Sequence, residues 1–275
     1  MTQVEAVARH YDALDVHYRE IWGEHVHHGY WRSGRERPEQ ATRALVELVA
    51  DAAEIRAGAR VCDVGCGYGA TSRWLVAERG AAVVGLTVSA AQHRHALADL
   101  GGAENPRILL RSWLDNGLPD QAFDAVIAIE SISHMEDRAR VMAECHRVLV
   151  PGGRLVVLDW LAGEGASRWQ RRALLDPICR DGRLPELNTL RDYARLAATA
   201  GLTEVHGRDI SAHVWRTWPV VLARGVRRLP SDRELRRLVL DRSHAEHGFI
   251  TMTVRVLVGY ATRAFRYGML TARRA

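Results

Sequence analysis

The chain of 275 residues contains no lysine, and all 38 of its basic residues are arginine. Schiff-base catalysis and the anchoring of pyridoxal phosphate both require a lysine amine, so the sequence excludes both. A Walker-type phosphate-binding loop requires Gly-Lys-Ser/Thr and is excluded for the same reason. Whatever reaction the protein performs, it uses neither a lysine nucleophile nor a P-loop.

Metal-binding patterns are also missing. The chain has four cysteines but no CxxC pair, so we expect reduced thiols and neither a structural zinc site nor a disulfide framework. The histidines of the segment HVHHG are His25, His27 and His28. They lack the helical i, i+4 spacing of many metal sites. We therefore expect no metal cofactor.

Long apolar runs are absent too. None reaches the roughly 20 residues that span a bilayer, and the polar N-terminus MTQVEAVARHYDALD is unlike a signal peptide. We expect a soluble, cytoplasmic protein with no membrane partner. The net charge of +5 is compatible with an anionic partner, but the absence of lysine indicates a coding bias. We therefore interpret the basic stretch 224–237 as a solvated helix face and expect no nucleic-acid partner.

The middle of the chain alternates short apolar runs with helical periodicity, which predicts an α/β fold with a parallel sheet. A helix is expected first, at Gln40–Ile55. The expected strands are Arg60–Val64, Ala82–Leu86, Pro106–Arg111, Phe123–Ile129 and Arg154–Trp160. The helices expected between them are Thr71–Glu78, Ala90–Asp99 and Arg138–Leu149.

The two ends of the chain depart from this rhythm. We expect an N-terminal helical lid at residues 1–40 and the Rossmann-like core at residues 41–160. Residues 161–264 predict a helical cap with a sixth strand, and 265–275 a closing strand. In this last part a polar, arginine-rich stretch runs to Leu187. It precedes helix Thr189–Ala200, strand Thr203–Ile210, helical segments Ala212–Arg228 and Asp232–Tyr260, and strand Phe265–Arg273. Ligands bind beyond the carboxyl ends of strands in such sheets, where this cap would lie.

A glycine-rich turn follows the first expected strand in the run VCDVGCGYGA. Gly65 and Gly67 allow a sharp bend that brings backbone N–H groups close to a ligand. The spacing to Ala70 also matches a loose dinucleotide fingerprint. However, the carboxylate of Asp63 would repel a pyrophosphate. It favours a ligand with an ammonium group, such as the methionine half of S-adenosylmethionine, unless Asp63 only caps the turn.

The run VCDVGCGYGATS resembles the first motif of class I methyltransferases. The segments VVGLTVSAAQ and LRSWLDNGLPDQAFDAVIAIESISHMED resemble the following motifs. With IWGEHVHHGYW and FRYGMLTARR, they are similar to the subgroup of γ-tocopherol, sarcosine and geranyl diphosphate C-methyltransferases. The resemblance implies a Rossmann-like seven-stranded sheet with an antiparallel last strand. It also implies S-adenosyl-L-methionine as cofactor and S-adenosyl-L-homocysteine as product.

The resemblance further implies which residues bind the cofactor. The methionine portion would contact the glycine turn, and the adenine would lie against the segment after the third strand. Many class I enzymes hold the ribose with an acidic residue where this chain has Thr87, so Ser89 and Gln92 would supply polar contacts. Tyr11, Tyr18 and Trp22 would form a lid, unless they only pack on the domain. The expected cofactor-binding residues are Tyr18, Trp22, Asp63, Gly65, Cys66, Gly67, Thr87, Ser89, Gln92, Ser112, Trp113, Leu114 and Ile129.

The reacting groups are expected after the fourth and fifth strands. Glu130 would contact the substrate or stabilise a developing cation. His134 is our candidate for general base or substrate orienter, because a histidine pKa lies near 6.5; the alternative is a helix cap. Asp159 would orient His134 or a substrate amine, unless it is a turn residue.

The acceptor is expected to be a small apolar or aromatic natural product. Trp160, Trp169, Trp215 and Trp218 suggest a π-rich pocket, or else core packing. A carbon acceptor is favoured, in a prenylated indole of the teleocidin type or a prenyl diphosphate held by Arg168, Arg171 and Arg172. Methylation of such an alkene would form a carbocation that is then quenched or cyclised.

Several alternatives remain open. The acceptor could be the nitrogen or oxygen of a small amine or phenol. A nucleic-acid methyltransferase is a minor alternative, because the chain has neither a Pro-Cys dipeptide nor an Asn/Asp-Pro-Pro-aromatic motif. A nicotinamide oxidoreductase and a catalytically silent cofactor-binding protein are further candidates. A homo-oligomer could form through the N-terminal helix.

Overall fold

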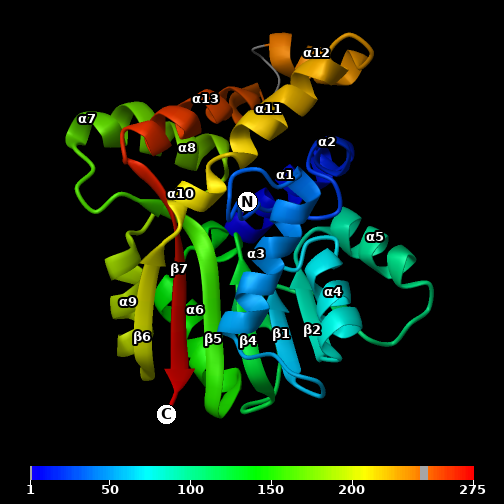
Figure 1. Ribbon diagram of the computed structural model, residues 1–275, viewed down its shortest axis with the longest axis vertical. Coiled ribbons are helices and arrows are strands. Elements are labelled where there is room, and N and C mark those ends of the chain that lie inside the picture. Colours follow the sequence, from blue (N-terminus) through cyan, green and yellow to red (C-terminus); the bar gives the residue numbers. More distant parts are fainter. Residues whose placement is uncertain (1, 242–246) are drawn as a thin grey trace.

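The protein is described here by a computed structural model that covers residues 2–241 and 247–275. A seven-stranded sheet has the order β3-β2-β1-β4-β5-β7-β6. The strands β1 to β5 are parallel, and β7 runs antiparallel to β5 and β6 (Figure 1). The bounds are β1 Arg60–Val64, β2 Ala82–Thr87, β3 Arg107–Leu110, β4 Phe123–Ile129, β5 Leu149–Ala162, β6 Leu202–Asp209 and β7 Phe265–Arg274. The expected sheet, including its antiparallel closing strand, is confirmed.

Helices cover both faces of the sheet (Figure 1). On one face, α3 (Pro38–Ala52), α4 (Ala70–Arg79) and α10 (Ser211–Val214) pack their apolar side chains on β1, β4 and β5. On the other, α6 (Arg138–Val148) and α9 (Leu190–Thr199) pack on the alternate side chains of the same strands. α5 (Ala90–Leu100) lies beside β2 and β3. The central strands are buried on both sides, which explains their nearly continuous apolar sequences.

The remaining helices gather over the carboxyl ends of the strands (Figure 1). The N-terminal pair is α1 (Gln3–Ala13) and α2 (Asp15–Ile21). The others are α7 (Arg168–Gln170), a π-helical turn Arg171–Leu175, α8 (Asp176–Asp181), α11 (Thr217–Arg228), α12 (Arg233–Leu240) and α13 (His247–Ala261). Their apolar cluster includes Leu174, Ile178 and Trp218, all buried. No helix in the described part of the chain is long and apolar enough to cross a bilayer.

Two local expectations differ from the structure. The arginine-rich stretch before Leu187 contains helical segments, because it exposes its arginines on one side and buries Leu174, Leu175 and Ile178 on the other. Each of the two helical segments expected late in the chain is divided: 212–228 contains α10 and α11, and 232–260 contains α12 and α13. α12 ends where Asp241 adopts an extended backbone, and residues 242–246 lie outside the described residues.

Candidate active site

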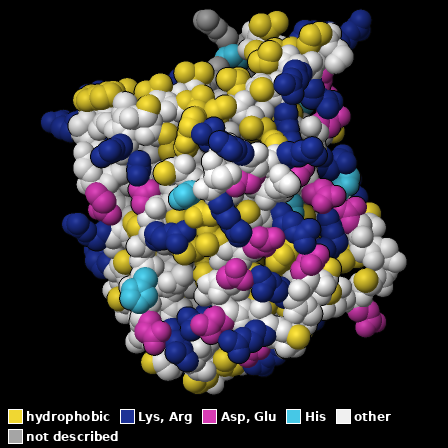
Figure 2. Space-filling view, viewed as in Figure 1, with side chains coloured by type: hydrophobic (Ala, Val, Ile, Leu, Met, Phe, Trp, Pro, Cys, Tyr) yellow, Lys and Arg dark blue, Asp and Glu magenta, His cyan; other side chains and the backbone are white. Residues whose placement is uncertain are grey.

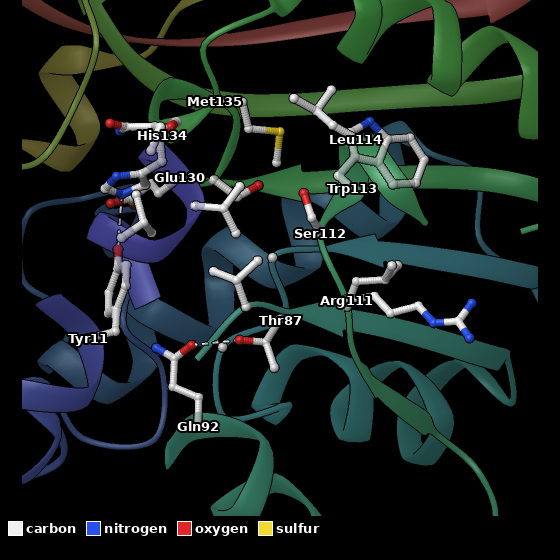
Figure 3. A pocket seen from close by; sticks show the side chains of 18 of the residues that line it. Tyr11, Thr87, Gln92, Arg111, Ser112, Trp113, Leu114, Glu130, His134 and Met135 are labelled. Atoms are coloured by element: carbon white, nitrogen blue, oxygen red, sulfur yellow. Dashed lines mark hydrogen bonds between the residues drawn. The ribbon is translucent and has the colours of Figure 1, made fainter. Parts of the chain in front are cut away.

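A cavity of about 1000 Å³ lies between the carboxyl ends of the parallel strands and helix α1 (Figure 3). The glycine turn after β1 forms part of its wall. The segments after β2, β3 and β4 form the rest, and α1 closes it from above. Of the residues expected at the cofactor, those that line it are Gly65, Gly67, Thr87, Gln92, Ser112, Trp113, Leu114 and Ile129.

The glycine turn has the conformation expected from its sequence. Gly65 and Gly67 have φ angles of 77° and 55°, which side chains with a Cβ seldom adopt. In addition, a Cβ at Gly65 would overlap the side chain of Ser131. The Ser131 hydroxyl donates a hydrogen bond to the carbonyl of Val64 (2.5 Å). The ends of β1 and β4 are therefore held together with no space for a side chain at Gly65.

Asp63 lies beneath this turn, beside a smaller cavity of about 360 Å³ between the turn and the segment Glu24–His27. It is buried, and its Oδ2 accepts a hydrogen bond from the Ser72 hydroxyl (2.6 Å). Burial raises the pKa of Asp63 to about 6. Cys66 also lines this cavity. A buried carboxylate with one neutral partner is suited to an ammonium group, which would stabilise its charged form.

This arrangement predicts that cofactor affinity depends on pH. Protonation of Asp63 below pH 6 would remove its attraction for an ammonium group, so the Kd of S-adenosylhomocysteine should rise about tenfold between pH 8 and pH 5. Asp63→Asn should bind weakly and without this pH dependence, whereas the exposed Asp51→Asn should retain it. Calorimetry across this range measures both effects. If the Kd of Asp63→Asn changed with pH as much as that of the unaltered protein, Asp63 would not have this role.

Of Thr87, Ser89 and Gln92, the residues expected near the ribose, Thr87 and Gln92 line the cavity. The Thr87 hydroxyl donates to the Gln92 side-chain carbonyl (2.9 Å), which leaves the Gln92 amide NH₂ group directed into the cavity (Figure 3). Ser89 does not line the cavity. Its hydroxyl donates to Asp12 of α1 (2.5 Å) and accepts from the backbone of Gln92 at the start of α5. Ser89 thus fixes the position of α1 on the core.

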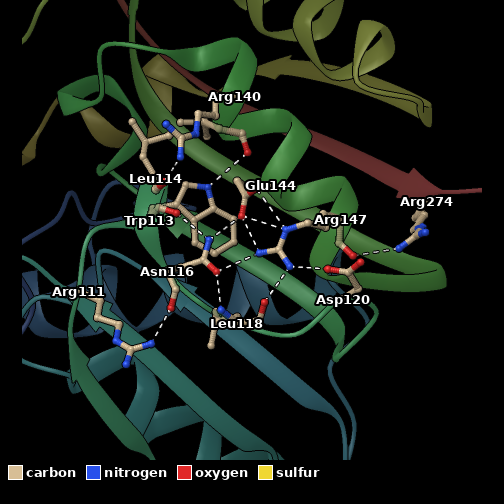
Figure 4. Close-up of polar contacts among 11 residues, drawn as sticks. Arg111, Trp113, Leu114, Asn116, Leu118, Asp120, Arg140, Glu144, Arg147 and Arg274 are labelled. Atoms are coloured by element: carbon tan, nitrogen blue, oxygen red, sulfur yellow. Dashed lines mark hydrogen bonds and ion pairs between the residues drawn. The ribbon is translucent and has the colours of Figure 1, made fainter.

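The wall expected at the adenine is fixed by a polar network (Figure 4). Asn116 donates to Glu144 (2.8 Å), and Arg147 binds both Glu144 and Asp120. The indole of Trp113 is buried and donates to a carbonyl of α6, at Val141. Arg111, which sequence reasoning did not select, also lines the cavity, and it donates to the carbonyl of Asn116. The cavity wall formed by residues 111–114 is therefore rigidly supported.

A second, smaller pocket adjoins the cavity. Tyr18, Trp22, Trp160 and Trp218 line it, together with His10. We call it the aromatic pocket. Tyr18 and Trp22 were expected at the cofactor but lie here, because the chain breaks direction at Leu14 between α1 and α2. Two of the expected aromatic residues are elsewhere: Trp169 and Trp215 are 58% and 38% exposed.

Glu130 stands where the cavity and the aromatic pocket meet, since it lines both. Its carboxylate accepts four hydrogen bonds: from the His28 backbone (2.6 Å), the His28 imidazole (2.9 Å), the Tyr267 hydroxyl (2.9 Å) and the Trp160 indole (2.9 Å). Burial opposes ionisation, but the interaction with His28 outweighs it, and the pKa of Glu130 falls to about 2. Glu130 is therefore a permanent anion.

The backbone of Glu130 is strained as well. Its φ angle is 53°, in the left-handed region that residues with a Cβ rarely adopt. Such strain costs on the order of 1–3 kcal/mol and persists where surrounding contacts enforce it, often at functional sites. The four hydrogen bonds enforce it here. Sequence reasoning identified Glu130, but not Tyr267 and His28, which hold it from distant parts of the chain.

The proton positions on His28 follow from its partners. The indole of Trp218 donates to Nε2 (2.9 Å), and the Tyr260 hydroxyl lies 3.3 Å from the same atom. Because an indole nitrogen can only donate, Nε2 carries no proton. The proton is on Nδ1, which donates to Glu130. His28 joins the cap to Glu130, and it lies too deep to act as a metal ligand without breaking these bonds.

His134 and Tyr11 form a pair at the same junction, and both line the cavity and the aromatic pocket. The Tyr11 hydroxyl lies 3.0 Å from His134 Nε2, and His134 Nδ1 lies 3.3 Å from the Arg183 carbonyl. Since a carbonyl only accepts, Nδ1 carries the proton and Nε2 accepts from Tyr11. Burial and the nearby His10 lower the pKa of His134 to about 4, and burial raises the pKa of Tyr11.

Asp159 lies behind His134 and lines neither pocket among the described residues. It is buried and accepts from the backbone N–H groups of Ser133 (2.7 Å) and Trp160 (2.8 Å). The Tyr193 hydroxyl lies 3.4 Å away. Burial raises the pKa of Asp159 to about 6. Its contacts suit a residue that positions the turn carrying His134, and not one that touches a substrate.

Comparison with known proteins agrees with this geometry. A profile of the family described as mycolic acid cyclopropane synthetase matches residues 1–222. The chain belongs to this family. It is a methyltransferase, and its methyl donor is S-adenosylmethionine. The expected family resemblance, enzyme class and cofactor are thereby confirmed.

Relatives of the methyltransferase act on different atoms. It is 30% identical to the chloroplastic tocopherol O-methyltransferase of Arabidopsis thaliana, over 98% of this chain and 82% of that protein. It is 31% identical to the dimethylglycine N-methyltransferase of Parasynechococcus marenigrum, over 86% and 82%. It is 26% identical to 24-methylenesterol C-methyltransferase 2 of Arabidopsis thaliana, over 78% and 63%. The family alone therefore does not fix the acceptor atom.

Solved structures share the architecture of the methyltransferase. The [4+2]-cyclase SpnF superposes with a TM-score of 0.82 at 25% identity, over 98% of this chain and 94% of that one. The cyclopropane synthase MmaA2 of Mycobacterium tuberculosis superposes with a TM-score of 0.85 at 19% identity, over 99% of both chains. The second likeness concerns the fold alone.

The residues present fit the donor. The ammonium end would lie at Asp63, the ribose at Thr87 and Gln92, and the adenine between Leu114 and the loop after β2. Glu130 lies between the larger cavity and the aromatic pocket and lines both. A methyl group carried by a sulfonium at that point would face the aromatic pocket.

Proposed function

We propose that the methyltransferase transfers a methyl group to a carbon atom of a small apolar acceptor bearing a prenyl or terpenoid alkene. The proposal rests on one observation: a permanently ionised, fully hydrogen-bonded carboxylate, Glu130, adjoins a pocket walled by aromatic rings. Methylation of an alkene produces a cation and needs no base beforehand. An anion and π-faces are the groups that stabilise a cation.

The reaction balances without an added reagent. The sulfonium supplies an activated methyl group. The π electrons of the alkene form the new C–C bond while the pair of the C–S bond remains on sulfur. This leaves a positive charge on the neighbouring carbon, close to Glu130. A proton then leaves an adjacent carbon, unless an internal attack closes a ring first. The methyltransferase must hold the alkene in line and exclude water during these steps.

The Tyr11–His134 pair is our candidate acceptor for that proton. The Tyr11 oxygen would take it while the phenolic proton moves to His134 Nε2, and the Arg183 carbonyl would hold the opposite side of the ring. The low pKa of His134, about 4, makes it a weak base for an ammonium or a phenol. His134 is nevertheless basic enough to accept a proton from a carbocation, because the protons on the carbons next to the charge are very acidic. This comparison favours carbon over nitrogen and oxygen.

The side chains that line the aromatic pocket support an apolar acceptor. The aromatic pocket offers Tyr18, Trp22, Trp160 and Trp218, and ionic groups for binding a charged substrate are few there. Arg168, Arg171 and Arg172 are exposed on the outer side of the cap and line neither pocket, so a prenyl diphosphate held by them is the weaker candidate. The aromatic walls favour a prenylated indole, which carries no phosphate.

An acceptor screen tests this function. We expect incubation with methyl-labelled cofactor to label prenylated indoles and other uncharged prenyl compounds more than about tenfold above amines and phenols without a prenyl group. His134→Gln should still methylate the alkene but change the ratio of alkene or ring products, because proton removal is altered. Arg195→Gln, on the far surface, is the control. If only amines or phenols were labelled, and no prenyl compound, the result would contradict the proposal.

A second candidate is methylation of a small phenol or amine. The relatives named above that methylate oxygen and nitrogen favour it. It requires a proton acceptor with a pKa close to that of the acceptor group. If it holds, His134→Gln should abolish transfer instead of changing the products, so the same variant distinguishes the two functions.

A further inference from the structure

The outer surface of the cap exposes an unusual number of large apolar side chains. Figure 2 shows hydrophobic atoms gathered along this edge of the molecule, over α7, α13 and α11. We call this surface the apolar cap face. It comprises Trp169 of α7, Leu222 and Val226 of α11, and Val254 and Val258 of α13, which are 58%, 44%, 55%, 59% and 41% exposed.

The helices of the cap, with the segments that join them, carry the positive charge of the protein. In the sequence, the segments 168–181, 217–241 and 247–261 contain eleven arginines and five acidic residues, a net charge of +6, whereas the whole chain has +5. The rest of the chain is thus close to neutral. Among these arginines, Arg168, Arg171, Arg172, Arg227 and Arg237 are exposed. Exposed apolar side chains within a basic surface are the pattern of segments that lie on anionic lipid bilayers.

We propose that the apolar cap face binds the surface of an anionic membrane. No membrane-spanning helix is needed for this, because the apolar side chains enter only the headgroup boundary while the arginines meet lipid phosphates. Charge favours this occupant over a second copy of the chain: a symmetric dimer through this face would place two arginine-rich surfaces against each other. The expectation of no membrane partner considered only spanning segments and signal peptides.

The interior of the cap contains a cavity that relates membrane binding to the reaction. A further apolar cavity of about 410 Å³ lies between α2 and helices α11 to α13. It shares Tyr18, Trp22 and Trp218 with the aromatic pocket. The two pockets are therefore adjacent, with these three rings as a shared wall. Delivery of a lipid-dissolved acceptor to the reacting groups depends on the proposed function, whereas binding of the surface to lipid does not.

Vesicle sedimentation of the full chain, without cofactor or acceptor, tests the binding. We expect more protein to pellet with phosphatidylcholine vesicles containing about 30% phosphatidylglycerol than with phosphatidylcholine alone, and about 0.5 M NaCl to reduce the difference. Val226→Glu with Val254→Glu should lower the pelleted fraction at least about fivefold. Leu97→Glu with Leu110→Glu, which change side chains 47% and 46% exposed on α5 and β3, should not. Circular dichroism verifies that the variants are folded.

A second pair of double variants tests whether binding requires the arginines of the cap. Arg171→Gln with Arg172→Gln should weaken binding to anionic vesicles, and Arg94→Gln with Arg107→Gln, which remove the same charge elsewhere, should not. Equal pelleting with both lipid compositions, or equal loss in both pairs, would overturn the proposal. So would sedimentation velocity that shows a dimer dissociated by Val226→Glu with Val254→Glu. Failure of the acceptor screen alone would affect only the proposed function.

Discussion

Glu130→Gln is expected to reduce kcat by about 10²–10³-fold, the effect of removing one preorganised electrostatic group from an active site. The substitution keeps the shape of the side chain and removes its charge at the junction of the two pockets. It also turns a group that only accepts hydrogen bonds into one that must donate, although all four partners of Glu130 are donors. Single-turnover measurements with labelled cofactor determine the loss.

The control for this prediction separates charge from folding. Glu78→Gln changes an exposed carboxylate that is paired with Arg43 on the surface, and its kcat should stay within about threefold of the original. Calorimetry should show that Glu130→Gln binds S-adenosylhomocysteine within about tenfold of the unaltered protein, because the residues around the amino-acid end are unchanged. If folded, cofactor-bound Glu130→Gln kept its full turnover, the anion would have no part in the reaction.

Gly65→Ala is expected to abolish measurable cofactor binding, with a rise in Kd of at least about 100-fold and a loss of stability of roughly 3 kcal/mol. The φ angle of 77° is unfavourable for alanine, and the added Cβ would overlap Ser131. The ends of β1 and β4 would have to separate. The hydrogen bond from Ser131 to the Val64 carbonyl would then break, and the turn would lose the shape that meets the methionine end.

Gly58→Ala is the matched control. Gly58 has a nearly equal φ of 80°, but no atom lies within 4 Å of the position of its Cβ. It should lose only about 1 kcal/mol for the backbone conformation and retain cofactor binding. Thermal unfolding and calorimetry of both variants separate the steric overlap from the conformational cost. Equal effects of the two substitutions would show that close packing of the turn on β4 is not required.

The alternating core was predictable because its information is local. Each central strand is a short apolar run and each helix between them has one apolar stripe, so periodicity alone places β1 to β5 and α4 to α6 within a few residues. The helices of the arginine-rich segment, α7 and α8, were not predicted. The many polar residues there leave too few apolar ones to show a helical periodicity. The segment's buried side chains Leu174, Leu175 and Ile178 are spread over a π-helical turn and the short helix α8.

The site was predictable where a residue's role follows from its place at a strand end. Gly65, Gly67, Thr87, Glu130 and His134 all line the cavity for this reason. Residues on the N-terminal helices were harder. Helical spacing shows that Tyr11, Tyr18 and Trp22 share a face, and all three line the aromatic pocket, but after the break at Leu14 only Tyr11 also lines the larger cavity. Ser89 and Asp159 are at the expected ends of helix and strand, but their hydrogen bonds are already used within the protein.

By itself, the sequence determined the parallel α/β core, the glycine turn with its carboxylate, and the candidate methyl donor, because these depend on residues close together in the chain. Only the tertiary structure decided the electrostatics of the reacting groups. Glu130 is a permanent anion because His28, Trp160 and Tyr267 converge on it from the N-terminal segment, β5 and β7. A pKa depends on burial and on such partners in space, and spacing along a chain does not specify them.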